Sequence, residues 1–371
     1  MKWINLINQL SSKKKLRDFF LENSNSQNHF NFKKAIIVGM SEEGIRLKQI
    51  LDSYSNCNIV ACADDNLSLR TPDNLRISSI DNLGVFDKDC KVIICSHRPL
   101  ELFSRLKKMG FNDVISFWEL QVLFPEKFPP HMFYEKWFDD LAENLEKYNA
   151  LFDIFKDKKS RIQLDAILGY RLTADIKILE KIIDPNLYNI SEFRKFNNNE
   201  IYYDCGAFDG DSIDMFKKNV DDTFERIVAF EPDNKTYLSL KKNFENFNNI
   251  DCINKAVSDL ETELSFVNDG SRGALLNEGS SFKVKCTTID NFSQISRITF
   301  IKMNIEGGEI KALKGAVKTI KKWAPTLAIS VYHRVSDLWY IPMQIREYNK
   351  NYKLSFRHHD LGIIESVCYA Y

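Results

Sequence analysis

The stretch IYYDCGAFDGDS, from Ile201 to Ser212, decides the fold of this 371-residue chain. Its first half is apolar, β-branched and aromatic, which favours a buried strand. Glycines then allow a tight turn, and Ser212 is a good N-cap for the helical pattern that follows. The stretch therefore predicts a strand, a tight loop and a helix.

Carboxylates surround this loop and restrict the ligand that it suits. A helix N-terminus carries about half a positive charge and favours phosphate, but Asp204, Asp209 and Asp211 would repel a pyrophosphate. The next expected strand, residues 226–230, ends at Glu231, where a carboxylate commonly holds a ribose diol. S-adenosylmethionine is a cation with a ribose and no phosphate, so it fits this pattern.

Four sequence blocks occur in order along the chain. They are YDCGAFDGD at 203–211, FEPD at 230–233, NKAVSD at 254–259 and IKMNIEGGE at 301–309. Together they resemble the FkbM family of S-adenosylmethionine-dependent methyltransferases over roughly residues 165–371. The resemblance implies an α/β fold: a class I methyltransferase-type, Rossmann-like sheet, mostly parallel, with an antiparallel C-terminal strand pair.

The same resemblance implies where the cofactor, S-adenosyl-L-methionine, lies. The loop after the first strand would border its methionine part, Glu231 its ribose, and the tips of the second and third strands its adenine. The implied cofactor-binding residues are Asp204, Cys205, Gly206, Ala207, Phe208, Asp209, Glu231, Pro232, Asp233, Lys255, Ala256 and Asn304. No metal is expected.

Two further residues are candidates for catalysis. Glu306 follows the expected fourth strand, and Gly307-Gly308 allow a sharp turn into a helix expected at 309–322. His333 follows the fifth strand, and the carboxyl ends of parallel strands meet at one edge. A histidine titrates near neutral pH, and a base that removes a hydroxyl proton contributes roughly a hundredfold or more. His333 is thus the expected base, with a buried structural histidine as the alternative.

Asn304 departs from the family, which usually has aspartate at this position. Asparagine keeps an acceptor oxygen but carries no charge and cannot act as a base. If the position only forms hydrogen bonds, activity survives. If it must be ionised, the chain is a catalytically impaired, methyltransferase-fold binding or scaffold protein.

The first third of the chain predicts a second, smaller Rossmann-like α/β domain. Strands are expected at 34–38, 58–63, 91–95 and 113–116, with helices between them. The run from Gly39 to Gly44 resembles a dinucleotide fingerprint, but Ser41 replaces the glycine that lets the backbone approach a pyrophosphate.

Several functions are open for this smaller domain. One interpretation is that it holds a nucleotide sugar, with Asp64 near the ribose and with His97 and Arg98 in contact with the anionic part of this ligand. Another is that it docks a partner or the other domain. A nucleotide-dependent oxidoreductase is a third interpretation, which Ser41 disfavours.

These patterns divide the chain into four expected parts. An N-terminal helical arm spans 1–30, the Rossmann-like domain 31–127, a helical connector or cap 128–198 and the methyltransferase domain 199–371. The arm is expected to be a helix packed on the first domain, with contact to a membrane surface as the alternative. Two glycine- and serine-containing stretches, 269–273 and 279–281, either close over an acceptor or only turn the chain.

Composition limits the partners and the compartment. Fifty-one Lys and Arg balance 51 Asp and Glu, so the net charge is zero. The chain therefore has no net positive charge to attract nucleic acid, and nucleic acid is not expected as a partner. The eight cysteines form no C-x-x-C pair, which is typical of a reducing compartment. Without a signal peptide or membrane span in the sequence, we expect a cytoplasmic protein. The family resemblance implies that it is an O-methyltransferase for polysaccharide biosynthesis. Its expected acceptor is a sugar hydroxyl of a cell-surface glycan or its precursor.

Overall fold

The computed structural model describes residues 1–24, 32–53, 57–69, 76–267, 275–276, 282–292 and 297–371. The stretches 269–273 and 279–281 lie outside the described residues. The chain divides into two compact units. Unit 1 comprises Met1–Ala150, Ile162–Ile183 and Asp360–Ile364, and unit 2 comprises Leu151–Arg161, Asp184–His359 and Glu365–Tyr371. Residues of the expected connector therefore belong to both units.

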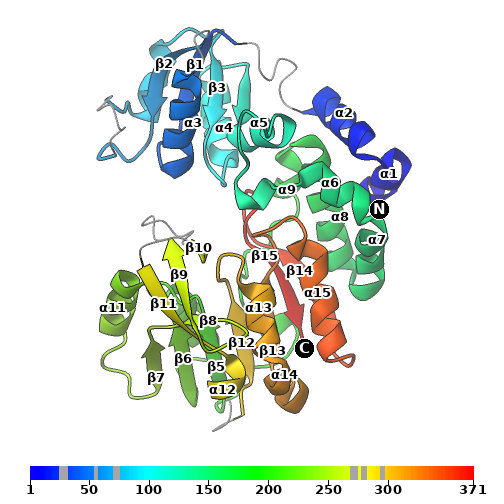
Figure 1. Ribbon diagram of the computed structural model, residues 1–371, viewed down its shortest axis with the longest axis vertical. Coiled ribbons are helices and arrows are strands. Elements are labelled where there is room, and N and C mark those ends of the chain that lie inside the picture. The colour runs from blue at the N-terminus through cyan, green and yellow to red at the C-terminus, as the bar shows by residue number, and fades with distance from the viewer. Residues whose placement is uncertain (25–31, 54–56, 70–75, 268–274, 277–281, 293–296) are drawn as a thin grey trace. The chain divides into compact units, whose positions relative to one another are not determined.

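Unit 1 contains a parallel four-stranded sheet in the order β2-β1-β3-β4, as the alternation of strands and helices predicts (Figure 1). Its strands are β1 (Lys34–Val38), β2 (Asn58–Ala63), β3 (Lys91–Ile94) and β4 (Val114–Ser116). Its connecting helices are α3 (Glu42–Asp52), α4 (Leu100–Lys108) and α5 (Phe117–Leu123), with a 3-10 helix at Ile80–Val85. Ile37 belongs to one buried cluster and its neighbour Ile36 to another, so apolar side chains cover both faces of β1.

Two N-terminal helices, α1 (Lys2–Leu10) and α2 (Lys13–Asn23), pack within unit 1. Ile7 and Phe20 have no exposed surface. The Asp165 carboxylate accepts hydrogen bonds from the backbone N–H groups of Trp3 and Ile4, at 3.1 and 2.9 Å, and so caps the first turn of α1. This burial agrees with a packed helix rather than one that lies on a membrane.

A group of helices follows the first sheet in the chain. They are α6 (Trp137–Glu143), α7 (Leu145–Ile154), α8 (Lys158–Thr173) and α9 (Lys177–Glu180), with 3-10 helices at Met132–Tyr134 and Ile190–Glu192. Ala174 ends α8 because its backbone lies in the left-handed region, with φ at 55°.

Unit 2 contains a seven-stranded sheet in the order β14-β15-β13-β12-β5-β6-β7. Its five parallel strands and the antiparallel pair at its C-terminal end confirm the class I methyltransferase-like topology. The strands are β5 (Ile201–Cys205), β6 (Arg226–Phe230), β7 (Ile250–Ile253), β12 (Phe300–Met303), β13 (Thr326–Ser330), β14 (Leu354–His358) and β15 (Ser366–Ala370).

Helices and a smaller sheet complete unit 2. The helices are α10 (Asp211–Asn219), α11 (Asn234–Asn243), α12 (Ile289–Phe292), α13 (Glu309–Lys314), α14 (Val317–Trp323) and α15 (Asp337–Tyr348). The smaller sheet has the order β10-β9-β11-β8, formed by β8 (Ala256–Val257), β9 (Glu263–Val267), β10 (Leu275–Leu276) and β11 (Phe282–Thr287).

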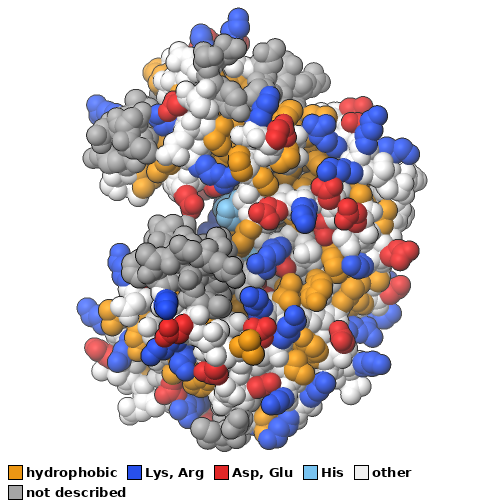
Figure 2. Space-filling view, viewed as in Figure 1, with side chains coloured by type: hydrophobic (Ala, Val, Ile, Leu, Met, Phe, Trp, Pro, Cys, Tyr) orange, Lys and Arg blue, Asp and Glu red, His pale blue; other side chains and the backbone are white. Residues whose placement is uncertain are grey.

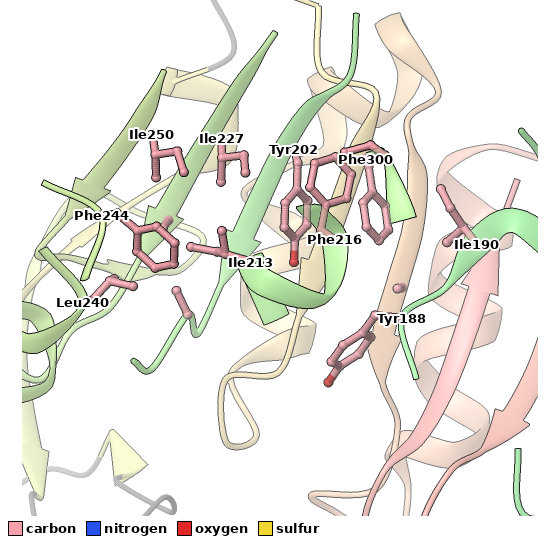
Figure 3. Close-up of a cluster of buried hydrophobic side chains, with 14 of the residues drawn as sticks. Tyr188, Ile190, Tyr202, Ile213, Phe216, Ile227, Leu240, Phe244, Ile250 and Phe300 are labelled. Atoms are coloured by element: carbon pink, nitrogen blue, oxygen red, sulfur yellow. The ribbon is translucent and has the colours of Figure 1, made fainter. Parts of the chain in front are cut away.

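An aromatic layer supports the central strands of the large sheet (Figure 3). Tyr202 on β5 stacks on Phe300 of β12 with 4.8 Å between ring centroids, and lies 4.6 Å from Phe216 of α10. Each such pair contributes about 0.5–1.5 kcal/mol beyond the burial of its area. The layer holds β5, β12 and α10 together, and thereby positions the loops that follow these two strands.

The surface agrees with the zero net charge of the chain. Figure 2 shows Lys, Arg, Asp and Glu side chains intermixed on the face in view. Among the helices of the described residues, none is long and apolar enough to cross a membrane.

Candidate active site

The loop after β5 requires glycine at its first turn. Gly206 has φ at 79°, in the left-handed region, and a Cβ built on it would lie 2.0 Å from the backbone oxygen of Asn304. The loops that follow β5 and β12 therefore touch backbone to backbone at this point. This contact brings the first and fourth sequence blocks to one edge of the sheet.

We expect Gly206→Ala to lower the free energy of unfolding of the protein by more than about 3 kcal/mol, because left-handed strain adds to the clash. Urea denaturation followed by circular dichroism measures this loss. Gly84→Ala is the control, since a Cβ at Gly84 has no neighbour within 4 Å. Equal stability of the two variants would show that the loop can move away from Asn304.

Asp204 is fully buried, and a lysine neutralises it. Its carboxylate lies 2.9 Å from the Lys302 ammonium of β12 and accepts a 2.5 Å hydrogen bond from the Ser212 hydroxyl. Lys302 also donates to the backbone oxygen of Gly206, at 2.7 Å. The expectation that Asp204 adds negative charge to the loop is therefore wrong, because this charge is paired within the sheet.

The helix after the loop begins two residues earlier than Ser212 predicts. The N-cap of α10 is Gly210, whose φ of 101° a side chain would disfavour, and Asp211 is the first helical residue. Ser212 is not the cap because its hydroxyl is directed to Asp204 instead. The remaining acidic side chains of the loop, Asp209 and Asp211, are exposed.

Glu231 joins the loop after β5 to the loop after β6. One carboxylate oxygen accepts the backbone N–H of Phe208 at 3.0 Å, and the other accepts that of Asp233 at 2.9 Å. The side chain is 7% exposed, and burial raises its pKa to about 7 although both hydrogen bonds oppose the rise. Each oxygen keeps a lone pair, so Glu231 can still accept from a ligand hydroxyl.

The other residues expected on the adenine side have local partners. Asp233 caps α11 through a 2.8 Å hydrogen bond from the Thr236 backbone N–H. Asn254, after β7, donates to the backbone oxygens of Glu231 and Pro232 at 3.0 and 3.1 Å, which joins the second and third blocks. Beyond it, Lys255 lies 3.8 Å from Glu261, and Ala256 is buried in β8.

Asn304 uses both ends of its amide. Its nitrogen donates to the Tyr188 hydroxyl at 3.2 Å, and its oxygen accepts from the Tyr332 hydroxyl at 3.1 Å. An ionised aspartate could accept from both tyrosines but could donate to neither. The amide is thus suited to the donor and acceptor that it faces.

Glu306 occupies a strained turn after β12. Its φ is 51°, a left-handed conformation that costs a residue other than glycine about 1–3 kcal/mol and often marks a functional site. Its side chain is 22% exposed. Burial raises the pKa of this carboxyl to about 7, although His333 opposes the rise.

His333 is completely buried between carboxylates. Its Nδ1 lies 3.0 Å from Glu309, and its Nε2 lies 3.4 Å from Glu306. Burial alone would lower its pKa, but these carboxylates raise the pKa to about 9. The expected role of His333 as the base is not supported, because it has no exposed surface and keeps its proton at neutral pH. Glu306 is the more accessible of the two.

The groups expected to meet a nucleotide sugar in unit 1 have partners within that unit. The Asp64 carboxylate accepts the Met40 backbone N–H at 2.6 Å. Burial lowers the pKa of His97 to about 4, so this imidazole is neutral near pH 7. Arg98 pairs with Asp360 at 2.6 Å. These contacts stabilise the loops of unit 1.

The family comparison agrees with this geometry. Residues 204–354 match the family model of the methyltransferase FkbM domain. This segment belongs to the FkbM methyltransferase family. The match spans all four sequence blocks except the first residue of the first one, so the chain contains a methyltransferase domain. No curated protein matches the sequence.

One solved structure shares the fold over most of the chain. A crystal structure of methyltransferase FkbM from Methylobacillus flagellatus KT has a TM-score of 0.72 and 24% identity, covering 96% of this chain and 92% of the other. Fibrillarin from Aeropyrum pernix, with natively bound S-adenosyl-L-methionine, reaches a TM-score of only 0.33 at 10% identity, covering 53% and 74%. The first comparison supports the FkbM fold over most of the chain.

Sequence reasoning missed several residues of the candidate site. Lys302 was one, although a lysine between Ile301 and Met303 in an apolar strand is a signal for a buried partner. Asn254 and Glu309 lie within the third and fourth sequence blocks, which assign no role to them. The other missed residues have contacts that depend on how the strands and helices pack, and they are Tyr188, Tyr332 and Asp337.

Proposed function

We propose that the FkbM domain transfers a methyl group from S-adenosylmethionine to a hydroxyl oxygen, with a sugar of a cell-surface glycan or its precursor as the acceptor. The observation that carries this proposal is Glu231. Its buried carboxylate ties the loops after β5 and β6 together at the carboxyl edge of the sheet, where open α/β sheets bind ligands. Its oxygens suit the two hydroxyls of a ribose.

The site residues fit this cofactor. Gly206 lets the loop after β5 approach the loop after β12 closely. Asp209 and Asp211 are exposed carboxylates of the same segment, and their negative charge favours a cationic ligand. Bound S-adenosylmethionine supplies an electrophilic methyl group. The protein then has to align the acceptor oxygen and exclude water.

Glu306 is the residue that we assign to the acceptor proton. It lies on the same edge as the cofactor loop, through the turn that contacts Gly206, and its carboxylate is partly exposed. His333 faces it at 3.4 Å and holds it in place. His333 is thus a positioning residue.

Calorimetric titration of the purified full chain with S-adenosylmethionine tests the cofactor, and we expect binding in the micromolar range. Incubation with a panel of sugars, followed by detection of S-adenosylhomocysteine, then tests turnover. Absence of binding would overturn the proposal. Binding without turnover on any sugar would favour the scaffold function that Asn304 raises.

On an acceptor that gives turnover, we expect Glu306→Gln to lower kcat by about 10²–10⁴-fold, because a positioned base contributes that much. The affinity for S-adenosylmethionine should stay unchanged. Glu225→Gln is the matched control, since Glu225 is exposed and precedes the opposite end of β6. Full activity of Glu306→Gln would exclude this carboxylate as the proton acceptor.

A further inference from the structure

We propose that Glu309, His333 and Asp337 bind a divalent metal cation inside the FkbM domain. One possible ligand atom from each of the three side chains lies within 4.8 Å of the other two, and all three residues are buried. Glu309 begins α13, His333 follows β13 and Asp337 begins α15, so a cation here would join three elements of the domain.

One short distance within the cluster suits coordination. Metal bonds of about 2.1 Å to nitrogen and oxygen place neighbouring ligand atoms about 3.0–3.4 Å apart. His333 Nδ1 and Glu309 Oε1 are 3.0 Å apart, which matches one edge of such a polyhedron.

Two carboxylate oxygens at this position are buried and unused. Glu309 Oε1 accepts the Ile305 backbone N–H, and Asp337 Oδ2 accepts that of Arg334, each at 2.8 Å. The second oxygens, Glu309 Oε2 and Asp337 Oδ1, have no hydrogen-bond partner among the described residues. A buried polar atom without a partner is unfavourable. Coordination by both oxygens of each carboxylate would satisfy all four atoms.

Charge also favours a cation. Three carboxylates, Glu306, Glu309 and Asp337, lie around His333, and Glu365 adds a fourth within electrostatic range of Glu306. The nearby cationic groups are His333, Arg334 and Lys302, and Lys302 already pairs with Asp204 at 2.9 Å. A divalent cation would compensate the excess, and His333 would then bind it as a neutral imidazole.

The second nitrogen of His333 fits the usual surroundings of a metal-bound histidine. Such a ring normally donates its other N–H to a carboxylate, which fixes the tautomer. Nε2 faces Glu306 Oε2 at 3.4 Å. The cation would therefore orient Glu306 through His333, and its complete burial is typical of a structural site.

The donor set selects among the metals. One imidazole and two carboxylates suit Mn²⁺ or Zn²⁺, whereas Mg²⁺ and Ca²⁺ favour oxygen ligands alone. We expect EDTA-treated full-length protein to bind one Mn²⁺ or one Zn²⁺ in calorimetry without S-adenosylmethionine, and bound Mn²⁺ to broaden its EPR signal. Failure of the proposed methyl transfer would leave this result unaffected.

Two variants test the ligands and keep the backbone hydrogen bonds. Asp337→Asn and Glu309→Gln each retain an acceptor oxygen, and we expect each to lower the metal affinity at least tenfold. Asp184→Asn is the control, because Asp184 is another buried aspartate of unit 2, which accepts the Asn186 backbone N–H, pairs with Lys159 and lies outside the cluster. It should bind metal as the wild type does.

The proposal fails if the wild-type protein binds neither Mn²⁺ nor Zn²⁺, or if both ligand variants bind as tightly as the wild type. If one variant does not fold, the other variant and the wild-type titration decide. A loss of binding that also occurs in Asp184→Asn would show a general effect on stability and would equally contradict the assignment.

Discussion

Lys302→Met should destabilise unit 2 by about 3–5 kcal/mol, because it leaves the Asp204 carboxylate buried without its counterion. Asp204 has no exposed surface and Lys302 only 3%. The lysine also donates to the Gly206 backbone oxygen, so the loop after β5 loses a second contact. Urea denaturation of the full chain, followed by the fluorescence of its tryptophans, measures the loss.

A double variant separates the missing charge from the missing packing. Asp204→Asn combined with Lys302→Met removes both charges, and we expect it to recover more than half of the lost stability. The amide that replaces the carboxylate in this variant can still accept the Ser212 hydroxyl. If the double variant is less stable than Lys302→Met, the unpaired charge of Asp204 is not the cause of the lost stability.

Glu231→Ala should weaken binding of S-adenosylmethionine by about 100-fold. Two hydrogen bonds from the ribose hydroxyls to a charged acceptor together contribute about 3 kcal/mol. The loop would also lose the acceptor for the Phe208 backbone N–H. Calorimetry on the variant, with Glu225→Ala as an exposed control at the other end of β6, gives the difference. Unchanged affinity would move the cofactor away from this loop.

The pH dependence of binding is a second check on Glu231. Its pKa is raised to about 7, so the carboxyl is protonated below this pH and becomes a poorer acceptor for a cationic ligand. Wild-type affinity should therefore fall from pH 8 to pH 6, while Glu231→Gln shows no such change from this group. The free energy of unfolding of the unliganded protein should change in the opposite direction with pH. A carboxyl group with a raised pKa contributes stability at low pH, and this contribution is lost as the pH rises through 7.

The positions of the strands can be predicted from the local sequence, but the contacts between side chains of distant segments cannot. Runs such as Arg226–Phe230 are apolar throughout most of their length, so their positions follow from the sequence alone. The helical pattern at 309–322 gives α13 and α14 instead of one helix, because the chain turns at Gly315, where a Cβ would lie 2.0 Å from the Ser258 backbone oxygen. A contact between segments so far apart leaves no periodic signal.

The candidate site shows the same division. The position of Glu231 at the end of β6 follows from the strand pattern, and so does that of Glu306 after β12. The burial of His333 and its position between Glu306 and Glu309 depend on how β13, α13 and α15 pack. Sequence position predicts the edge of the sheet at which a residue lies, but not its exposure or its charge partner.

The left-handed backbone at Glu306 has a consequence for protein engineering. Replacing left-handed residues by glycine is a standard route to thermostability, and at this position it would relieve about 1 kcal/mol or more of strain. The same substitution would delete the carboxylate that faces His333. Under the role proposed for Glu306, a library selected only for heat resistance would favour a stable but inactive variant at this residue, which should therefore be kept as glutamate.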